Sequence, residues 1–519
     1  MTLLRISDWP IAWLPVVCFI ASGGQWYAEV SEQAGIEVVI NQNAPGGGIG
    51  VGDFNRNGFP DIFFNGYLAE NRLLFNNGDG TFSEDSLIAA QIALPGARCK
   101  AVAVADFDSD GWPDLFLACN DQNYLLRNLA GSGFDDVTPA NIRHTGRSEA
   151  AGWADLTGNG LLDLVLGVHS VGGDPADPNQ YDRILINQGN GTFIDIAPNL
   201  DLSRPITNTL ALKLSDITNN GRPDIYFVND RRHVGNDHNV LLANEGPGCG
   251  GWCFEDVSVI TGADRPAEGM GVAIADFDGD GHWDLFYTGY LEQILLRNTH
   301  DQNGELGFDE VTDSAGVNHP AIGWGAAFLD ADNDGWEDLA MTFTLPAPVN
   351  QDRLFINQGD GTFVDLEAQS GIHVNLPSEG LAWIDYQRNG RIDLLIHYFH
   401  QRYALFRNQL DNANRWLGLQ LEGGGAINRD AIGARVMVTT PDGRTRMRER
   451  RAGGSRGATH DYVLHFGIGE HASAEVTIVW PDGLVEEVGT LHSGRYHHRV
   501  YPPLELLFQD RFAPWSARQ

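Results

Sequence analysis

The chain has 519 residues, which is more than one hydrophobic core usually serves, so a repeat array or several domains is expected. It carries 69 Asp and Glu against 34 Lys and Arg, a formal net charge of −35. Nucleic-acid binding requires clustered cations, and this charge balance therefore excludes nucleic acid as an expected partner.

Residues 1–23 have the pattern of an export signal. The apolar stretch PIAWLPVVCFIA begins at Pro10 and is followed by the small residues ASGG. The stretch is shorter than the about 20 residues of a membrane-spanning helix, and no later segment resembles one. We expect a secreted protein, either extracellular or periplasmic; a buried N-terminal strand is the alternative for this segment.

A nine-residue acidic turn recurs seven times along the chain. In DFDSDGWPD, carboxylates occupy positions 1, 3, 5 and 9, and Gly occupies position 6. The first aspartates of successive copies are 49 to 61 residues apart, a period typical of repeat architectures. The copies begin at Asp53, Asp106, Asp155, Asp216, Asp276, Asp330 and Asp385.

Four short strands are predicted for each repeat. Apolar segments precede and follow the turn, as KAVAVA and DLFLAC do around Asp106, and a third and a fourth strand come next. This is the construction of a propeller blade. Only six fourth strands follow the seven turns, but YAEVSEQAG at Tyr27 matches FDEVTDSAG at Phe308. We therefore predict an all-β, seven-bladed propeller over residues 24–410, closed by its N-terminal strand, which removes exposed sheet edges.

The acidic turn is predicted to bind calcium. Calcium prefers about 6–8 oxygen ligands, and the side chains at positions 1, 3, 5 and 9 plus the backbone carbonyl at position 7 supply about five. Gly at position 6 permits the bend around an ion. An EF-hand is excluded because the turn ends with Asp at position 9 and is flanked by strands. The alternative is an Asx-rich turn that needs no metal. The predicted metal ligands are Asp53, Asn55, Asn57, Asp61, Asp106, Asp108, Asp110, Asp114, Asp155, Thr157, Asn159, Asp163, Asp216, Thr218, Asn220, Asp224, Asp276, Asp278, Asp280, Asp284, Asp330, Asp332, Asp334, Asp338, Asp385, Asn389 and Asp393.

The seven loops differ in acid content. The loops that begin at Asp106, Asp276 and Asp330 carry four acids each and should bind calcium most tightly. The other four loops have Asn, Thr or Gln in place of acids at positions 3 and 5. The loop at Asp385 includes Gln387 and is the weakest candidate.

Four cysteines follow the predicted export signal. Cys99 and Cys119 flank the Asp106 turn on strands predicted to be adjacent, and Cys249 and Cys253 could close a small loop. We expect two disulfides, which agrees with export; four free thiols in a cytosolic chain are the alternative.

A second, small β domain is predicted over residues 411–500. Its segments ARVMVTT and AEVTIVW alternate with a period of two, and PDG turns occur twice. The tail that follows, residues 501–519, has no recognisable motif.

Four arginines of the second domain alternate along one predicted strand and so project from one face. They bind sulfate, carboxylate or phosphate groups of an acidic glycan or lipid, or they dock onto the acidic propeller, or they are simply solvated. These candidate ligand-binding residues are Arg444, Arg446, Arg448 and Arg450.

The sequence resembles two known families. The repeats are similar to the FG-GAP/VCBS repeats of integrin-α-type propellers, whose calcium loops share the pattern D-x-[DN]-x-[DN]-G-x-x-D. The segments NRWLGLQLEG, NRDAIGARV, LHFGIGE and VWPDG resemble the ASPIC/UnbV domain, and the combination resembles the cartilage acidic protein family. The resemblance implies several structural calcium ions on the face opposite the ligand-binding loops. The family's GYLS-like stretch is replaced here by GSRGATHD.

The loops opposite the calcium turns are expected to converge on the channel mouth, a usual ligand site of propellers. We expect a monomeric binding or adhesion module whose partner is an extracellular protein or a glycan. The alternatives are a lyase or hydrolase that uses this face, although no G-x-S-x-G motif occurs, and an exported assembly factor. The polar residues of the predicted rim are Arg143, His144, Arg147, Glu149, Arg204, His233, His238, Arg265, Glu268, His319, His373, Glu379, His397 and His400.

Overall fold

The computed structural model describes residues 24–36, 47–143, 146–169, 181–200, 208–230, 238–249, 251–300, 305–344, 351–399, 402–453 and 456–501. The predicted export signal, residues 1–23, and residues 502–519 of the predicted tail lie outside this range. Among the described residues, no helix is long and apolar enough to cross a membrane.

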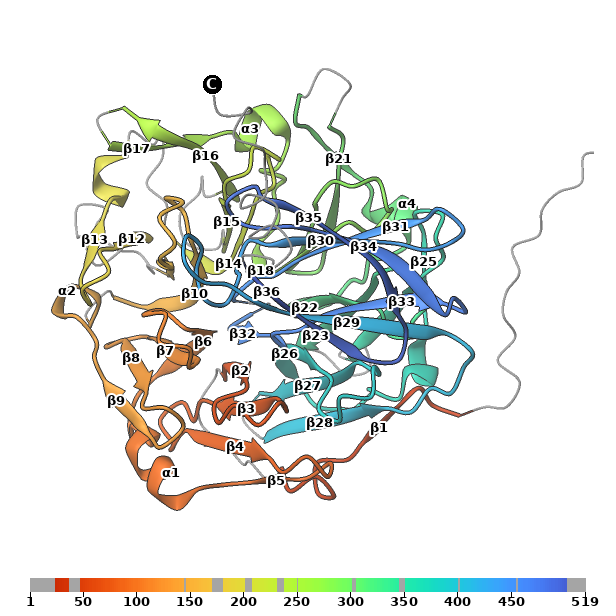
Figure 1. Ribbon diagram of the computed structural model, residues 1–519, viewed down its shortest axis with the longest axis horizontal. Helices are drawn as coiled ribbons and strands as arrows, with labels where there is room; N and C mark the ends of the chain where they lie inside the picture. The colour runs from red at the N-terminus through yellow and green to blue at the C-terminus, as the bar shows by residue number, and fades with distance from the viewer. Residues whose placement is uncertain are drawn as a thin grey trace, which may run out of the picture.

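Seven antiparallel sheets, each with four strands from the repeats, form a ring (Figure 1). The first blade has β2 (Ile49–Gly52), β3 (Asp61–Phe64), β4 (Arg72–Asn76) and β5 (Phe82–Ser83). The second has β6 (Cys99–Ala105), β7 (Asp114–Cys119), β8 (Tyr124–Asn128) and β9 (Phe134–Asp136). The third has β10 (Ser148–Ala154), β11 (Asp163–Val168), β12 (Arg183–Asn187) and β13 (Phe193–Asp195). The fourth has β14 (Thr209–Ser215), β15 (Asp224–Asn229), β16 (Val240–Gly248) and β17 (Gly251–Asp256).

The remaining blades repeat this order. The fifth has β18 (Gly269–Ala275), β19 (Asp284–Gly289), β20 (Gln293–Asn298) and β21 (Phe308–Glu310). The sixth has β22 (Ile322–Leu329), β23 (Asp338–Thr344), β24 (Arg353–Asn357) and β25 (Phe363–Asp365). The seventh has β26 (Ser378–Ile384), β27 (Asp393–Tyr398) and β28 (Arg402–Asn408), with β1 (Tyr27–Glu29) as its outer strand. Short helices connect blades: α1 (Ser86–Ile92), α2 (Ala140–Arg143), α3 (Ser258–Thr261), α4 (Thr312–Ala315) and the 3-10 turns Ala197–Asn199 and Glu367–Ser370.

The N-terminal strand closes the ring, as predicted. Strand β1 pairs antiparallel with β28, and Tyr27 lies opposite Asn408. The Tyr27 hydroxyl, fully buried, donates a hydrogen bond to the Ile392 carbonyl at 2.9 Å. The first strands of neighbouring blades contact one another around the whole ring, from β2 through β6, β10, β14, β18 and β22 to β26 and back to β2. The seven-bladed propeller is thus confirmed.

The first strands pack closely around the axis because they are built from small and apolar residues. All seven residues of β18, GMGVAIA, are buried. A Cβ at Gly271 would lie 1.8 Å from the carbonyl oxygen of Trp324 in the next blade, so only glycine permits this approach. Burial on every side explains why these strands are mostly apolar along their length rather than alternating.

A repeated asparagine in the third strand links neighbouring blades. The Asn128 amide nitrogen donates to the Phe54 carbonyl of the preceding blade at 3.0 Å, and Asn357 donates to the Phe277 carbonyl at 2.8 Å. Each acceptor is position 2 of an acidic turn. These asparagines are visible in the sequence as the N of LLRN and LFIN, but their role depends on contacts between blades and was not predicted.

Both predicted disulfides are present, between Cys99 and Cys119 and between Cys249 and Cys253. The first joins β6 to β7 within the second blade and closes a loop with a sequence separation of 20 residues, whereas the second separation is 4.

Removal of the Cys99–Cys119 disulfide is expected to lower the free energy of unfolding by about 3 kcal/mol, since it releases a loop of intermediate length in the unfolded chain. The measurement is urea unfolding of the Cys99→Ala/Cys119→Ala variant. The matched control, Cys249→Ala/Cys253→Ala, should lose clearly less. Equal losses would contradict the loop-length argument.

The second domain consists of two sheets that enclose their own core. One sheet has the order β33-β29-β36, with β29 (Arg415–Glu422), β33 (Leu464–Gly469) and β36 (Tyr496–Val500). The other has the order β31-β30-β34-β35, with β30 (Arg435–Thr439), β31 (Thr445–Glu449), β34 (Ser473–Val479) and β35 (Val485–His492). In Figure 1 these blue strands cross the middle of the ring. Strand β32 (Ala458–Thr459) leaves the domain and pairs parallel with β2 of the first blade.

Candidate calcium sites and the plugged channel

The three four-acid loops gather their carboxylates as a cation site requires. In each loop, one ligand atom from each of three aspartates lies within 4.8 Å of the others. The Oδ1 atoms of Asp276 and Asp330 are buried and have no hydrogen-bond partner among the described residues. Carboxylate oxygens left in this state fit a hard divalent cation such as calcium. The triads are Asp106, Asp108 and Asp114; Asp276, Asp278 and Asp284; and Asp330, Asp332 and Asp338.

Backbone amides shape each loop around its first aspartate. The two carboxylate oxygens of Asp106 accept hydrogen bonds from the amides of Asp110 at 3.0 Å and Gly111 at 2.7 Å. Gly111 has φ +95°, a conformation that glycine adopts without strain, which explains the glycine at position 6. Asp114, at position 9, accepts from the amides of Phe107 and Asn128 and joins the loop to two strands.

The aspartates of these loops have raised pKa values when no cation is bound. Burial and the nearby carboxylate of Asp430 raise the pKa of Asp106 to about 8. Burial raises the pKa of Asp114 well above its ordinary value. Burial and Asp334 raise the pKa of Asp332 to about 7. Without a bound cation, ionising these acids is costly; a calcium ion among them would reverse that balance.

The other four loops lack such triads among the described residues, and two of them are engaged by the second domain. Arg435 forms an ion pair with Asp216 at position 1 of its loop, and its Nη1 donates to Asn219 at 2.6 Å. The Tyr496 hydroxyl donates to the Asp385 carboxylate at 2.6 Å. Calcium binding by the loops at Asp53, Asp155, Asp216 and Asp385 stays a prediction.

The second domain covers the calcium-loop face of the ring. The Gly467 amide donates to Asp330 Oδ2 at 3.0 Å, and Asp430 accepts from the Asp106 amide at 2.8 Å. A predicted metal ligand in the Asp330 loop therefore also accepts a hydrogen bond from the second domain. If calcium binds there, calcium binding and domain docking share this carboxylate.

The arginine stripe lies partly on this interface. Arg446 donates to the Gly335 carbonyl and stacks over the Trp336 ring at 3.7 Å. Arg448 pairs with Glu337 at 2.8 Å. Arg450 is buried, while Arg444 pairs with Asp442 of its own domain at 2.7 Å and is half-exposed. Two of the four arginines thus contact an acidic loop of the propeller; ligand binding by the stripe stays a prediction.

A segment of the second domain fills the central channel. Ala452 forms a bridge with Trp153 of the third blade. The Gly457 carbonyl accepts from the Val102 amide of the second blade at 3.0 Å, and the Asp461 amide donates to the Trp383 carbonyl of the seventh blade at 3.2 Å. Apart from Ala452, these contacts come from the stretch GSRGATHD, in which the described residues begin at 456.

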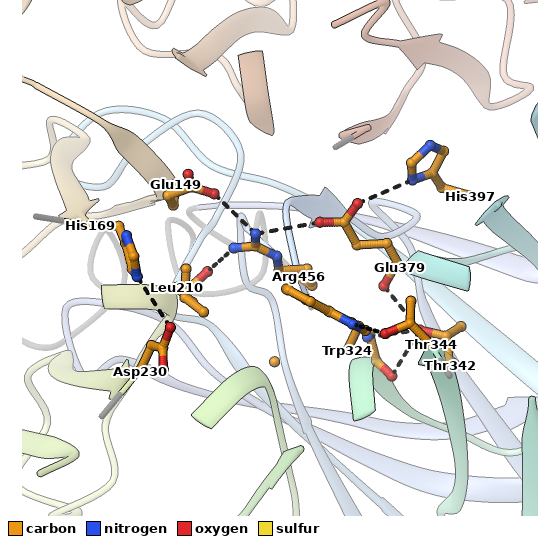
Figure 2. Close-up of polar contacts among 12 residues, drawn as sticks. Glu149, His169, Leu210, Asp230, Trp324, Thr342, Thr344, Glu379, His397 and Arg456 are labelled. Carbon is orange, nitrogen blue, oxygen red and sulfur yellow. Dashed lines mark hydrogen bonds and ion pairs between the residues drawn. The ribbon is translucent and has the colours of Figure 1, made fainter. Parts of the chain in front are cut away.

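Arg456 of this segment reaches the channel end opposite the calcium loops (Figure 2). Its Nη2 lies 3.0 Å from Glu149 Oε2 and 3.4 Å from Glu379 Oε1, and its Nη1 donates to the Leu210 carbonyl at 2.8 Å. Its guanidinium also lies 5.0 Å from the centre of the Trp324 ring. These four partners come from near the beginnings of β10, β26, β14 and β22, whose other ends lead into the acidic turns.

The cations of this Arg456 cluster keep Glu149 ionised. Burial opposes ionisation of Glu149, but Lys100 and Arg456, followed by His169 and Arg147, outweigh it and hold the pKa of Glu149 at about 2. Glu149 is therefore ionised at neutral pH.

Comparison with known proteins agrees with this two-part structure. Residues 424–502 match the ASPIC and UnbV family, and residues 53–117, 106–166, 216–287 and 330–396 match the FG-GAP-like repeat. The chain is an FG-GAP-repeat protein with a C-terminal ASPIC/UnbV domain. It is distantly homologous to cartilage acidic protein 1. The Mus musculus protein is 26% identical over 474 residues, which cover 84% of this chain and 70% of that protein. The Homo sapiens protein is 24% identical over 475 residues, which cover 84% of this chain and 69% of that protein.

Solved structures with partial similarity include two kinds of protein. A lectin of Agrocybe aegerita that recognises terminal N-acetylglucosamine has a TM-score of 0.39 and 20% identity, covering 62% of this chain and 79% of the lectin. The BBS1N chain from a complex with ARL6DN has a TM-score of 0.45 and 12% identity. The match covers 75% of this chain and 99% of the BBS1N chain.

The structure brings together some of the predicted rim residues and separates others. Glu149, Glu379 and His397 lie in or beside the Arg456 cluster, with His397 Nδ1 3.9 Å from Glu379 Oε2. Arg147 joins the cluster through Glu149 at 3.2 Å, whereas Arg143 lies apart and pairs with Asp136 at 3.0 Å. The rim residues outside the described part of the chain are His144, Arg204, His233 and His400.

Arg456 itself was missed by sequence reasoning. The only signal was the departure GSRGATHD from the ASPIC/UnbV pattern, and nothing in its spacing indicated that it enters the propeller. Only the docking of the ASPIC/UnbV domain places this arginine between carboxylates of the third and seventh blades.

Proposed function

We propose that this protein is a secreted, calcium-stabilised binding module whose ligand is an extracellular protein or a glycan. The observation that carries the proposal is the contrast between the two ends of the ring. The acidic loops contact the ASPIC/UnbV domain, so calcium bound there would stabilise the fold rather than take part in ligand binding. The opposite end carries the charged rim, in which Arg147 has a side chain 44% exposed.

The Arg456 cluster supports binding rather than catalysis. A general acid or base works best when its pKa lies near the working pH. Glu149 has a pKa of about 2, and the Arg456 guanidinium is shared by two carboxylates. This favours a positioning role for the cluster over proton transfer. The enzyme alternative would need other groups of the same rim.

The two disulfides support secretion. Disulfides form and persist in oxidising compartments and are rare in the cytosol. Their presence at Cys99–Cys119 and Cys249–Cys253 fits an extracellular or periplasmic location, and adhesion is one use of a module placed there.

An array of neutral and acidic oligosaccharides, followed by purified collagen, fibronectin and laminin, tests the proposal in calcium-containing buffer. We expect saturable binding to one related set of probes, reduced at least about tenfold by Arg147→Ala, since a charged rim contact contributes roughly 1–3 kcal/mol. Arg495→Ala is the matched control, because Arg495 is also exposed but lies in the other domain, outside the arginine stripe.

Two results would count against this function. Equal losses in both variants would place the binding surface elsewhere, and no binding to any probe would reject the named ligand classes. Appearance of cleaved oligosaccharides, detected by mass spectrometry, would instead favour the enzyme alternative.

A further inference from the structure

A cavity of about 90 Å³ lies between the first strands of the propeller and the ASPIC/UnbV domain. Its lining includes Lys213 of β14, Trp283, Trp383, Arg451 and His460. A site that holds one water needs roughly 10–15 Å³ by the same kind of measure, so this cavity has room for several waters or a small ligand. It is separate from the Arg456 cluster and from the acidic triads.

Lysine is confined to the interior of this protein. Lys100 and Lys213 are the only lysines in the sequence, and both are buried. All other permanent cations are arginines. Lysine differs from arginine as a compact point charge whose proton can be lost on burial. Lys100 acts on Glu149, where it helps to hold the carboxylate ionised. The Glu449 carboxylate acts on Lys213, but it is already paired with Arg451.

Among the described residues, Lys213 has no carboxylate partner at ion-pair distance in this cavity, and Arg450, which also lines it, donates to the Arg451 carbonyl at 2.8 Å. Three carboxylates line the cavity, and each already pairs with an arginine. Lys213 Nζ contacts the Gly453 carbonyl at 3.3 Å, and no described carboxylate lies within 4.0 Å of it. A buried ammonium without a counter-ion is costly. The three ion pairs are Glu337 with Arg448 at 2.8 Å, Glu449 with Arg451 at 2.9 Å and Asp461 with Arg388 at 2.7 Å.

His460 adds a second hydrogen-bond donor. Its Nδ1 accepts from the Trp383 amide at 3.3 Å, so the neutral imidazole carries its proton on Nε2. Burial, followed by the nearby charges of Lys213 and Arg451, holds the pKa of His460 well below its ordinary value. The imidazole is therefore a neutral donor. Burial and Arg451 also lower the pKa of Lys213 to about 7.

We propose that this cavity binds one small monovalent anion, a halide or a one- or two-carbon carboxylate, between Lys213, Arg451 and His460. The anion supplies the counter-charge that Lys213 lacks at ion-pair distance. It sits where β14 of the propeller meets the channel segment of the ASPIC/UnbV domain, and so stabilises the contact between the two domains.

Selective [13C]lysine labelling of the full chain tests this proposal, because two lysines yield two sets of side-chain signals. Lys213→Met assigns the Lys213 signals. At fixed calcium and ionic strength, sodium gluconate serves as the reference salt because gluconate is too large for the cavity. Bromide and acetate are the probes.

We expect bromide, acetate or both to shift the Lys213 signals saturably and to raise the midpoint of the Lys213 titration by about 1 pH unit or more, as an adjacent anion does. Lys100 is the internal control and should not respond. The two probes distinguish a halide site from a carboxylate site. In thermal melts, the same salts should raise the Tm of the wild type but not of Lys213→Met.

A Lys213 titration that is identical in gluconate, bromide and acetate would overturn the proposal. Equal shifts of both lysines would also overturn it, because they would indicate a general salt effect. The titration is measured on the wild-type protein, and Lys100→Met gives the same assignment by difference if Lys213→Met does not fold.

Discussion

Chelation of calcium is expected to lower the Tm of this protein by roughly 10 °C or more. Three sites saturated at 100 times their Kd would each contribute about 2.7 kcal/mol to the free energy of unfolding. A change of 1 kcal/mol corresponds to about 2 °C in a large domain. The cause is the cost of burying the acids around Asp106, Asp276 and Asp330 without a cation. Calorimetry with calcium and with EGTA measures the shift.

A substitution that removes one carboxylate tests whether the Tm difference comes from calcium bound by an acidic loop. Asp278→Asn changes position 3 of a four-acid loop and should lose one calcium ion per chain by native mass spectrometry, together with part of the Tm difference. Asp360→Asn is the matched control, since Asp360 is exposed and lies outside the acidic turns. The calcium interpretation is wrong if the purified protein contains no calcium and EGTA leaves its Tm unchanged.

Substitution of Arg456 by methionine is expected to lower the free energy of unfolding by about 3–5 kcal/mol, because it leaves Glu149 and Glu379 buried without their shared cation. Both carboxylates are nearly fully buried, so water cannot replace the guanidinium. Urea unfolding at pH 7 measures the loss. Arg444→Met is the matched control and should change stability by about 0.5 kcal/mol or less, as exposed substitutions do.

The same variant has a predicted pH dependence. The pKa of Glu149 is depressed from 4.5 to about 2 in the folded protein. A carboxylate whose pKa is depressed by folding stabilises the folded state at pH values above its pKa in the unfolded chain. This contribution is lost as the pH falls from about 4.5 toward 2. Arg456→Met lowers this contribution, so the gap between wild type and variant should narrow on acidification. A gap that stays constant from pH 7 to pH 3 would contradict an electrostatic origin.

The ring and its closure were predictable from the sequence because they depend on local patterns. Each acidic turn sits between two apolar strands, and the spacing of the turns sets the number of blades. The match between the segments at Tyr27 and Phe308 was enough to assign the N-terminal strand to the seventh blade, where it pairs with β28. The three acid-rich loops were also identifiable, since all their ligands lie within nine consecutive residues.

The contacts between the propeller and the ASPIC/UnbV domain could not be predicted from local sequence patterns. Arg435 lies 219 residues after Asp216, and no periodicity connects them, yet they form an ion pair. Arg456 and Glu149 are separated by 307 residues, and they meet because the ASPIC/UnbV domain docks on one face and extends a segment through the channel. In the sequence, Lys213 is a single charged residue in an otherwise mostly apolar strand. Its burial depends on the segment of the ASPIC/UnbV domain that covers it.

Local patterns therefore sufficed to predict the repeat, the blade count and the acidic loops, because neighbours along the chain are neighbours in these structures. Which charges are buried, and which carboxylates pair with an arginine, depend on the tertiary structure. Burial and pairing arise from contacts between domains that lie far apart in the chain, and the energy of a charge depends on those contacts.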